Sequence, residues 1–465
     1  MTQALRKKLS DSVGARWAAL VIVAFTMMMG YFLTDVMSPL ENMLETQPYS
    51  WSSSEYGFFS GSYGYINVFL LMLFFGGLIL DKMGVRFTGL MSCSLMLIGA
   101  LIKFYALEFI SPADTISAGI IGYADGIKVQ VLVASLGFAV FGVGCEITGI
   151  TVSKIIAKWF NGHEMALAMG FQVALARLGT AGALAFSPMV AANYHLATPV
   201  LVGAIMLCIG LLAFIVYIVM DKKLDASMAE EIAANKEANG GDDNFKLSDL
   251  TLIFKNPGFW LVTFLCLLFY SGVFPFLKFA TKLMIFKYGV PESWAGYIPA
   301  ILPFGTIILT PVFGTLYDKI GKGATLMIIG SVMLTAVHVM FALPILNTSW
   351  FAIILMVMLG IAFSLVPSAM WPSVPKIIPM KQLGSAYSII FYIQNIGLSM
   401  VPVLIGYVIE NYAKQPAVNG VTNYDFTIPM TIFAIFGIAA IVIAFALKVL
   451  DGKKHYGLEQ ANIKK

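Results

Sequence analysis

The sequence is poor in charged residues, and this scarcity sets its class. Only 12% of the 465 residues are Asp, Glu, Lys or Arg, whereas 59% are hydrophobic. A water-soluble protein of this length could not bury so much apolar surface, so the composition predicts that a lipid bilayer is its main solvent. The net charge of +4 is too small to indicate a nucleic-acid partner.

Other absences exclude catalytic, redox and ATP-driven classes. The chain has no Gly-x4-Gly-Lys-Ser/Thr loop for nucleotide phosphates, which argues against a primary pump. The four cysteines fall inside apolar segments, at spacings that match no metal or redox motif. The four histidines are scattered and supply no catalytic cluster: His163, His195, His338 and His455. We therefore expect no enzyme, no cofactor and no metal.

Twelve apolar segments are long enough to cross a bilayer, because a hydrocarbon core of ~30 Å needs about 20 helical residues. We expect spans at 17–38, 57–80, 87–107, 129–153, 164–190, 197–220, 257–280, 295–317, 324–345, 350–374, 383–410 and 427–449. This pattern predicts an all-α integral membrane protein. The expected domains are a six-helix bundle at 1–220, a cytoplasmic linker at 221–256, a second six-helix bundle at 257–450 and a cytoplasmic tail at 451–465.

The distribution of Lys and Arg predicts the orientation. Most of the 29 basic residues fall on one side if both termini are cytoplasmic, as the positive-inside rule requires. The first span follows Arg6, Lys7 and Lys8, but it is too long for the apolar core of a signal peptide, so we interpret it as an uncleaved anchor.

One loop signature occurs twice, at equivalent places in the two halves. Its members are Gly77, Asp81, Lys82, Gly84 and Arg86 in the first copy, and Gly314, Asp318, Lys319 and Gly321 in the second. Two similar membrane halves are typical of a secondary transporter. We expect these residues to control conformation: each aspartate would meet a helix N-terminus or a basic side chain of the neighbouring bundle and hold the cytoplasmic side shut. A solvent-exposed turn charge is the alternative.

Two charged residues lie at membrane depth, where a lipid-facing charge is costly. Arg177 falls near the middle of span five, and Glu146 falls in span four. One interpretation is a structural ion pair between the two helices. In another, Arg177 binds a substrate carboxylate through two parallel hydrogen bonds and Glu146 binds an ammonium group. A third assigns them proton coupling alone.

Weaker polar signals surround these two. Asp35 ends span one, where it would bind substrate or gate the outer mouth, or simply contact water. His338 is a candidate for proton coupling together with Glu146, although a lone membrane histidine is more often a packing residue. Four further residues are expected to line a substrate cavity, with interhelical hydrogen bonding as the alternative for the two amides: Gln394, Asn395, Trp371 and Tyr392.

Prolines at membrane depth predict bent helices. Pro275, Pro372 and Pro402 fall in spans seven, ten and eleven. Broken or bent helices at this depth are tolerated where they border a cavity.

The signature loop resembles that of the major facilitator superfamily, and the likeness extends over essentially the whole chain. Several stretches are similar to the lysosomal dipeptide-uniporter branch of that superfamily and its bacterial relatives: Phe141–Glu146, Trp159–Glu164, Gly170–Gln172, Ala176–Gly179, Val273–Phe276, Met370–Pro372, Gln382–Tyr387 and Gln394–Leu398. The resemblance implies the twelve-helix facilitator fold. It also implies that Glu146 and Arg177 contact the two ends of a dipeptide in a central cavity, with Asp35 matching an acidic residue that ends the first helix.

The chain departs from this branch in places. Cys145 replaces a small residue before Glu146, and the segment after Asp35 lacks the branch's Asn-Pro pair. No lysosomal sorting signal is evident, so we expect a bacterial inner membrane. The expected partners are a peptide-like or amino-acid-like small molecule and the bilayer, with the chain active as a monomer. The alternatives are a facilitator or proton symporter of organic anions or other small solutes, and a receptor that binds a solute without moving it.

Overall fold

The computed structural model describes residues 9–119, 122–160, 163–227, 252–379, 382–417 and 422–461. Its first part contains η1 (Leu9–Asp11), α1 (Val13–Asp35), η2 (Ser38–Leu40), α2 (Glu41–Glu45), α3 (Ser53–Ser62), α4 (Tyr65–Phe69), α5 (Met72–Phe109), β1 (Thr115–Ala118), β2 (Tyr123–Lys128), α6 (Val129–Trp159), α7 (Met165–Asn193) and α8 (Thr198–Ser227). Its second part contains α11 (Pro257–Tyr288), α12 (Glu292–Ala295), α13 (Tyr297–Ile320), α14 (Gly323–Ala342), α15 (Ser349–Ile377), α16 (Leu383–Val408), η5 (Ile409–Ala413) and α17 (Thr427–Lys454). Most of the expected linker, residues 228–251, lies outside the described residues.

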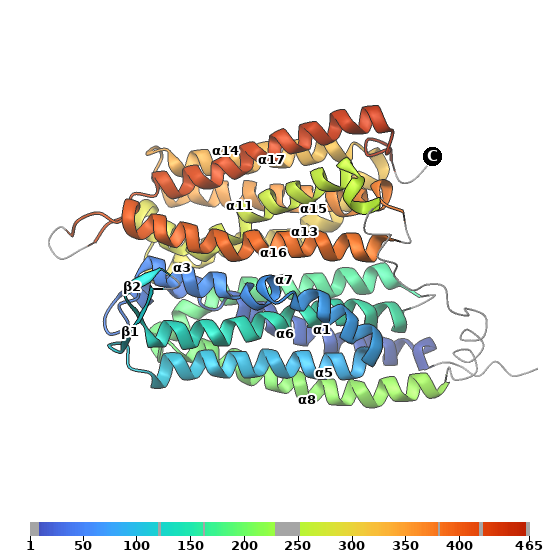
Figure 1. Cartoon of the computed structure of the whole chain (residues 1–465), viewed down its shortest axis with the longest axis horizontal. Coiled ribbons are helices and arrows are strands. Elements are labelled where there is room, and N and C mark those ends of the chain that lie inside the picture. The colour runs from blue at the N-terminus through green and yellow to red at the C-terminus, as the bar shows by residue number, and fades with distance from the viewer. Residues whose placement is uncertain are drawn as a thin grey trace, which may run out of the picture.

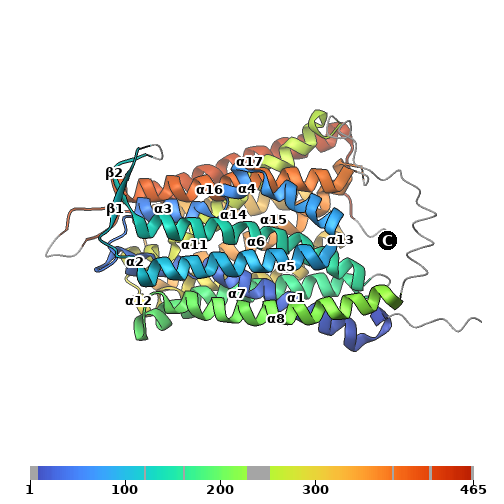
Figure 2. The ribbon, with the colours of Figure 1, turned by 60° about the horizontal axis from the view of Figure 1, so that its bottom comes forward.

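The helices form two bundles that lie side by side along the long axis of the molecule. Helices α1 to α8 make the first half and α11 to α17 make the second (Figure 1). The start of α1 and the end of α17 lie at one end, which we call the termini end (Figure 2). The β1–β2 hairpin, α2 and α12 lie at the opposite end, which we call the hairpin end.

The expected spans are present, but the second is not one helix. Among the described residues, eleven helices are long and apolar enough to cross a membrane. The remaining span, which is the second in chain order, consists of α3, α4 and the first part of α5. Helix α5 then continues through Gly84, where the backbone leaves helical geometry and the third span begins. The twelve-span, two-half architecture is thus confirmed, with a broken second span.

The second span breaks at a position without a proline. Leu71 has a left-handed backbone with a φ of 54°. The hydroxyl of Tyr392, in α16, donates to the Val68 carbonyl at 3.2 Å. Such a side-chain bond helps a backbone group at membrane depth whose helix is interrupted. The expected bends at Pro275, Pro372 and Pro402 do not interrupt α11, α15 or α16, which continue through them.

Glycines bring the two halves into close contact near the hairpin end. A Cβ on Gly57, in α3, would lie 2.5 Å from the Pro402 carbonyl oxygen and 2.9 Å from Gly406 Cα, both in α16. A Cβ on Gly296 would lie 2.0 Å from the Leu184 carbonyl oxygen of α7. Only glycine permits such backbone approach. The structure is therefore a conformation closed at the hairpin end.

The segment after α17 folds back onto the second half. The amides of Lys322 and Gly323, at the start of α14, donate to the Glu459 and Leu458 carbonyls at 3.0 and 2.8 Å. The Glu459 carboxylate accepts from the backbone and hydroxyl of Thr325 at 2.9 and 2.8 Å. Three of the first amides of α14 thus have acceptors from this segment, in the manner of a helix N-cap.

Candidate functional site

Arg177 lies in the middle of α7, half-buried, against aromatic rings from both halves. Its guanidinium carbon is 5.9 Å from the centre of the Tyr31 ring in α1. The corresponding distances are 5.6 Å to Phe274 in α11 and 5.1 Å to Phe363 in α15. Among the described residues, no side chain or backbone group forms a hydrogen bond or ion pair with Arg177. Cation–π contact stabilises the charge but leaves all five N–H donors without an acceptor.

Glu146 is half-buried in α6 and is held by one hydroxyl. Tyr63, at the end of α3, donates to Glu146 Oε1 at 2.9 Å. No cation of the described part of the chain lies within ion-pair distance of Glu146. The structural ion pair between Glu146 and Arg177, one of the three interpretations, is therefore not formed in this conformation. Both charges are available to an external partner.

Aromatic side chains connect Arg177 with Trp371, a residue the sequence placed in the cavity wall. Phe363 lies edge-on to Tyr270 at 5.7 Å, and the Trp371 indole N–H donates to the Tyr270 hydroxyl at 3.0 Å. Trp371 also stacks on Phe391 at 4.9 Å. The second half thus faces Arg177 with an aromatic wall, and none of its described residues forms an ion pair with Arg177.

Asp35 joins the two halves. Its Oδ1 atom lies 2.7 Å from Lys278 Nζ of α11, and its Oδ2 atom accepts from the Thr180 hydroxyl of α7 at 2.9 Å. Lys278 also donates to the Thr34 carbonyl at 2.9 Å. The Asp35 carboxylate is therefore engaged within the protein. Of the roles considered from the sequence, this geometry supports gating at the mouth.

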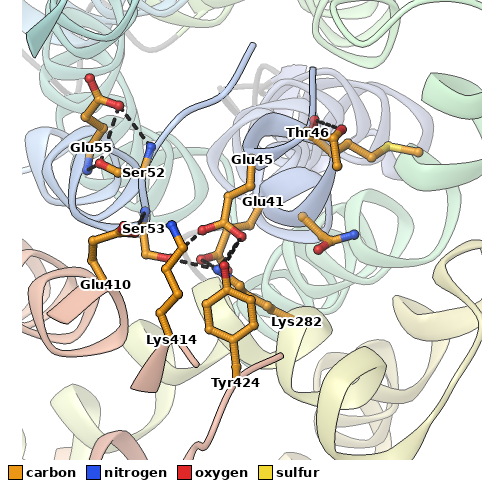
Figure 3. Close-up of polar contacts among 12 residues, drawn as sticks. Glu41, Glu45, Thr46, Ser52, Ser53, Glu55, Lys282, Glu410, Lys414 and Tyr424 are labelled. Atoms are coloured by element: carbon orange, nitrogen blue, oxygen red, sulfur yellow. Dashed lines mark hydrogen bonds and ion pairs between the residues drawn. The ribbon is translucent and has the colours of Figure 1, made fainter. Parts of the chain in front are cut away.

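A second set of contacts between halves lies further toward the hairpin end (Figure 3). Lys282, one turn beyond Lys278 in α11, is fully buried and reaches Glu41 and Glu45 of α2. The Tyr424 hydroxyl donates to Glu45 at 2.9 Å. The sequence alone indicates no role for Lys282, Glu45 or Tyr424. The only signal was the spacing of Lys278 and Lys282, which places both on one face of α11.

The two amides expected in the cavity wall are buried in α16. Gln394 Oε1 accepts from the Cys266 thiol at 3.6 Å, and Asn395 donates to the Phe391 carbonyl at 3.0 Å. The Gln394 contact joins α11 and α16, as the interhelical alternative requires, whereas the Asn395 bond stays within α16. Tyr392 lies instead beside a cavity of about 430 Å³ at the break of the second span, which is lined by Val68, Phe69, Leu71, Tyr392, Ile396 and Met400.

His338 is packed inside the second half. Its side chain is fully buried, and Nε2 lies 2.8 Å from the Gly272 carbonyl. The rings of Phe276 and Phe433 lie 5.0 and 5.2 Å from its own. This environment matches the packing interpretation, and it does not place His338 with Glu146.

The duplicated signature places a glycine of positive φ at the same point of each copy. Gly84 has a φ of 77° at the kink within α5, and Gly321 has a φ of 68° directly after the last residue of α13. Asp81 and Asp318 are helical residues just before these turns. The other two glycines of the signature, Gly77 and Gly314, have open space where a Cβ would be. Gly84 and Gly321 are thus the positions at which the motif requires glycine, because both have a positive φ.

The partner of Asp81 differs from the expectation. Lys154, in α6 of the same half, pairs with Asp81 at 2.7 Å. Arg86 pairs with Asp221 of α8 at 2.7 Å and also with Asp225. Lys82 and Lys319 are exposed. In a conformation closed at the hairpin end, these first-copy charges bind within their own half.

A model of the Major Facilitator Superfamily matches residues 20–402. The lysosomal dipeptide transporter MFSD1 of Bos taurus is 26% identical over 406 residues, covering 85% of this chain and 80% of that protein. The lysosomal dipeptide transporter MFSD1 of Homo sapiens is 25% identical over 407 residues, with the same coverage.

Solved structures of transporters share the fold. The nucleoside transporter NupG matches with a TM-score of 0.66 at 16% identity, covering 94% of this chain and 99% of that one. A POT family transporter in complex with a thioalcohol-conjugated peptide matches with a TM-score of 0.64 at 14% identity, covering 94% and 96%. At these identities the likeness establishes the fold alone.

Proposed function

This chain belongs to the Major Facilitator Superfamily, and from that premise we propose that it carries dipeptides across a membrane by alternating access between its two halves. As a multi-pass membrane transporter, it needs a central site that both sides reach in turn. Arg177 and Glu146 are charges of opposite sign, each in the middle of its helix.

The observation that carries the substrate proposal is the unpaired guanidinium of Arg177. A guanidinium at membrane depth without an acceptor is costly, and a carboxylate bound through two parallel hydrogen bonds offsets that cost. Arg177 alone would serve any organic anion. Glu146, held by the Tyr63 hydroxyl at 2.9 Å, adds a second charge that suits an ammonium group. A small molecule with both ends charged satisfies both residues.

The aromatic wall fits the remainder of such a substrate. Phe274 and Phe363 face Arg177 from the second half, so side chains of the dipeptide would meet polarisable, apolar surfaces without a fixed charge. Cationic side chains suit these ring faces as well. The MFSD1 proteins, described as lysosomal dipeptide transporters, support the same substrate class.

We also propose a bacterial inner membrane, with the termini end in the cytoplasm. The Lys and Arg distribution supports this orientation. The described conformation, closed at the hairpin end, would then face inward. Each chain holds Arg177 and Glu146 together with their aromatic wall, so a monomer suffices for transport.

The test is uptake by purified protein in liposomes, offered a dipeptide panel with and without a pH gradient. Free dipeptides should be taken up, while N-acetylated and C-amidated forms should be taken up poorly. Flux of an organic anion without dipeptide flux would overturn the substrate proposal. Binding without time-dependent uptake would indicate a receptor.

Two variants assign the ends of the substrate. Arg177→Met should abolish the preference for a free carboxylate over an amide, and Glu146→Gln should abolish the preference for a free amine over an acetylated one. Glu108→Gln is a matched control, because this carboxylate pairs with His195 at 2.8 Å at the end of α5. Unchanged preferences in both test variants would remove Arg177 and Glu146 from the site.

A further inference from the structure

The hairpin end contains a cluster of charged side chains between the two halves, which we call the gate cluster (Figure 3). The first half contributes two carboxylates from α2, and the second half contributes one ammonium from α11 and an ion pair at η5. Its members are Glu41, Glu45, Lys282, Glu410 and Lys414.

Lys282 is the cation at the centre of the gate cluster. Its Nζ atom lies 2.6 Å from Glu45 Oε2 and donates to the Ser53 hydroxyl at 2.7 Å. Glu41 Oε1 is a more distant acceptor at 3.4 Å. The Nζ atom also lies 4.0 Å from the centre of the Tyr424 ring. All three N–H donors of this ammonium are therefore engaged, and Glu45 has the shortest contact.

Glu45 is well stabilised as a carboxylate. Besides Lys282, it accepts from the Ser53 hydroxyl at 2.7 Å and from the Tyr424 hydroxyl at 2.9 Å. Burial and the neighbouring Glu45 raise the pKa of Tyr424 above its usual range. The Tyr424 hydroxyl therefore keeps its proton and remains a donor to Glu45.

Glu41 is not stabilised in the same way. The residue is 1% exposed, and among the described residues its Oε2 atom has no hydrogen-bond partner. Lys414 does not serve as a counter-charge for Glu41, because it pairs with Glu410 at 2.7 Å. The Ser53 amide donates to the same Glu410 carboxylate at 2.9 Å. Three carboxylates thus face two ammonium groups, and the surplus negative charge falls on Glu41.

Other polar and charged groups near α2 have partners of their own. Asp35 pairs with Lys278, and Glu55 caps α3 and lies 3.9 Å from Lys128. Glu292 of α12 accepts from the Asn42 amide at 2.6 Å. The hydroxyl of Tyr56, in α3, donates to the backbone carbonyl of Lys278 at 3.2 Å. None of these supplies a second cation to Glu41.

We propose that Glu41 is a proton-binding site that is occupied when the hairpin end closes and is emptied when the halves separate there. A buried carboxylate without a full counter-charge is unfavourable, and protonation removes the charge. On separation Lys282 leaves with the second half, and water then solvates Glu41 as an ordinary carboxylate. A proton fits better than a metal ion, since the described residues contain no group of three metal-ligating side chains.

Proton binding at Glu41 does not move a proton across the membrane. The proton enters from the solvent at the hairpin end and returns to the same side, because the closed cluster is buried. The site therefore makes closure depend on the pH of that compartment without carrying a proton across the membrane. The proposal rests on alternating access but not on the identity of the substrate, so its test needs no substrate.

The experiment measures closure directly. Spin labels are attached at Tyr194→Cys and Trp350→Cys, two exposed positions at the hairpin end on opposite halves. Cys208 is replaced by Ser, since the other three native cysteines are buried. Pulsed EPR distances are then collected in nanodiscs between pH 5 and pH 9. The closed-to-open ratio of the parent protein should fall with rising pH, by at most about tenfold per unit for a single proton.

Variants assign the effect to Glu41. Glu41→Gln should show, at every pH in the range, the same closed fraction that the parent protein shows at low pH. Glu45→Gln removes the same surplus charge and should also lose the pH dependence, with a smaller closed fraction because it weakens the contacts to Ser53 and Tyr424. Glu292→Gln, another carboxylate between the halves, should retain the parent's pH slope. Distances independent of pH in the parent, or a parent-like slope in Glu41→Gln, would overturn the proposal, whereas a failure of dipeptide uptake would leave these distances unaffected.

Discussion

Lys278 of α11 and Asp35 of α1 form an ion pair across the two halves, with Nζ and Oδ1 2.7 Å apart and both side chains largely buried. Lys278 also donates to the carbonyl of Thr34 at the end of the same helix. A single lysine therefore joins the second half to both the carboxylate and the backbone terminus of α1. The pair can form only while the hairpin end is closed.

Loss of Lys278 should open the hairpin end. Lys278→Met leaves Asp35 with the Thr180 hydroxyl alone, and breaking one side of a buried ion pair costs on the order of 3–5 kcal/mol. We expect a smaller closed fraction in the double-label distance measurement and slower transport. Asp35→Asn combined with Lys278→Met should be milder than Lys278→Met alone.

Lys128→Met provides the control for that experiment. Lys128 lies 3.9 Å from Glu55 at the same end of the molecule, but both residues belong to the first half. Its removal should leave the closed fraction unchanged. Parent-like distances in Lys278→Met would show that the pair contributes nothing to closure.

Tyr63→Phe should weaken substrate binding selectively. The variant removes the hydroxyl that donates to Glu146 Oε1 at 2.9 Å, and a hydrogen bond to a charged group contributes about 1.5–3 kcal/mol. If Glu146 binds the substrate amine, affinity for a free dipeptide should fall roughly 10- to 100-fold. Affinity for the N-acetylated form should change little.

Isothermal titration of both ligands checks this prediction. Tyr65→Phe serves as its control, because the Tyr65 hydroxyl donates to the Phe58 carbonyl in the same segment. Equal losses for the free and acetylated ligands would indicate that Tyr63 acts on folding rather than on Glu146.

Gly406→Ala should prevent full closure. A Cβ at this position would lie 2.4 Å from the Ser53 carbonyl oxygen and 2.8 Å from Gly57 Cα. Two backbones cannot shift as a side chain can, so α3 and α16 must separate. We expect a longer mean distance between labels at the hairpin end. Gly384→Ala, in the same helix but with nothing within 4 Å, should match the parent, and an equal effect in both variants would refute the steric explanation.

Alanine at the two signature glycines should have unequal effects. Both residues have positive φ, so Gly84→Ala and Gly321→Ala share a backbone strain of order 1–3 kcal/mol. Gly321 carries an additional penalty, because its Cβ would lie 2.4 Å from the Gln460 carbonyl carbon.

Thermal unfolding in detergent and limited proteolysis distinguish the two contributions. Gly321→Ala should lower the unfolding temperature more than Gly84→Ala and expose the segment around Glu459 to protease. Cleavage of that segment at the same rate in both variants would contradict the tight packing seen at Gly321.

Local sequence features predicted the architecture well. Features that depend on contacts with the opposite half could not be predicted from them. Long apolar runs sufficed for the twelve spans, and the duplicated signature identified the turns at Gly84 and Gly321. The break at Leu71 was missed, because no proline or glycine occupies it. Its stabilisation comes from a tyrosine more than 300 residues away in the chain, Tyr392.

The site shows the same division. The positions of Glu146 and Arg177 within their expected spans identified them as charges at membrane depth. Those positions could not determine whether the two charges pair with each other. The partners that decide this are Tyr63 and the aromatic rings of the second half, whose composition alone suggests only packing. The expected span ends at residue 280, whereas α11 continues to Tyr288 and includes Lys282.

The equivalent helix ends of the two halves are secured by different atoms. In the first half, Asp221 near the end of α8 binds the side chains of Arg86 and Lys158. In the second half, Asp451 near the end of α17 accepts from the backbone amides of Gly457 and Leu458. Each arrangement is complete within its own half, on one side or the other of residues 228–251. A gene divided within that interval would therefore encode two fragments that each retain their own terminal bonding, and co-expressed fragments of this kind have the parts needed to reassemble.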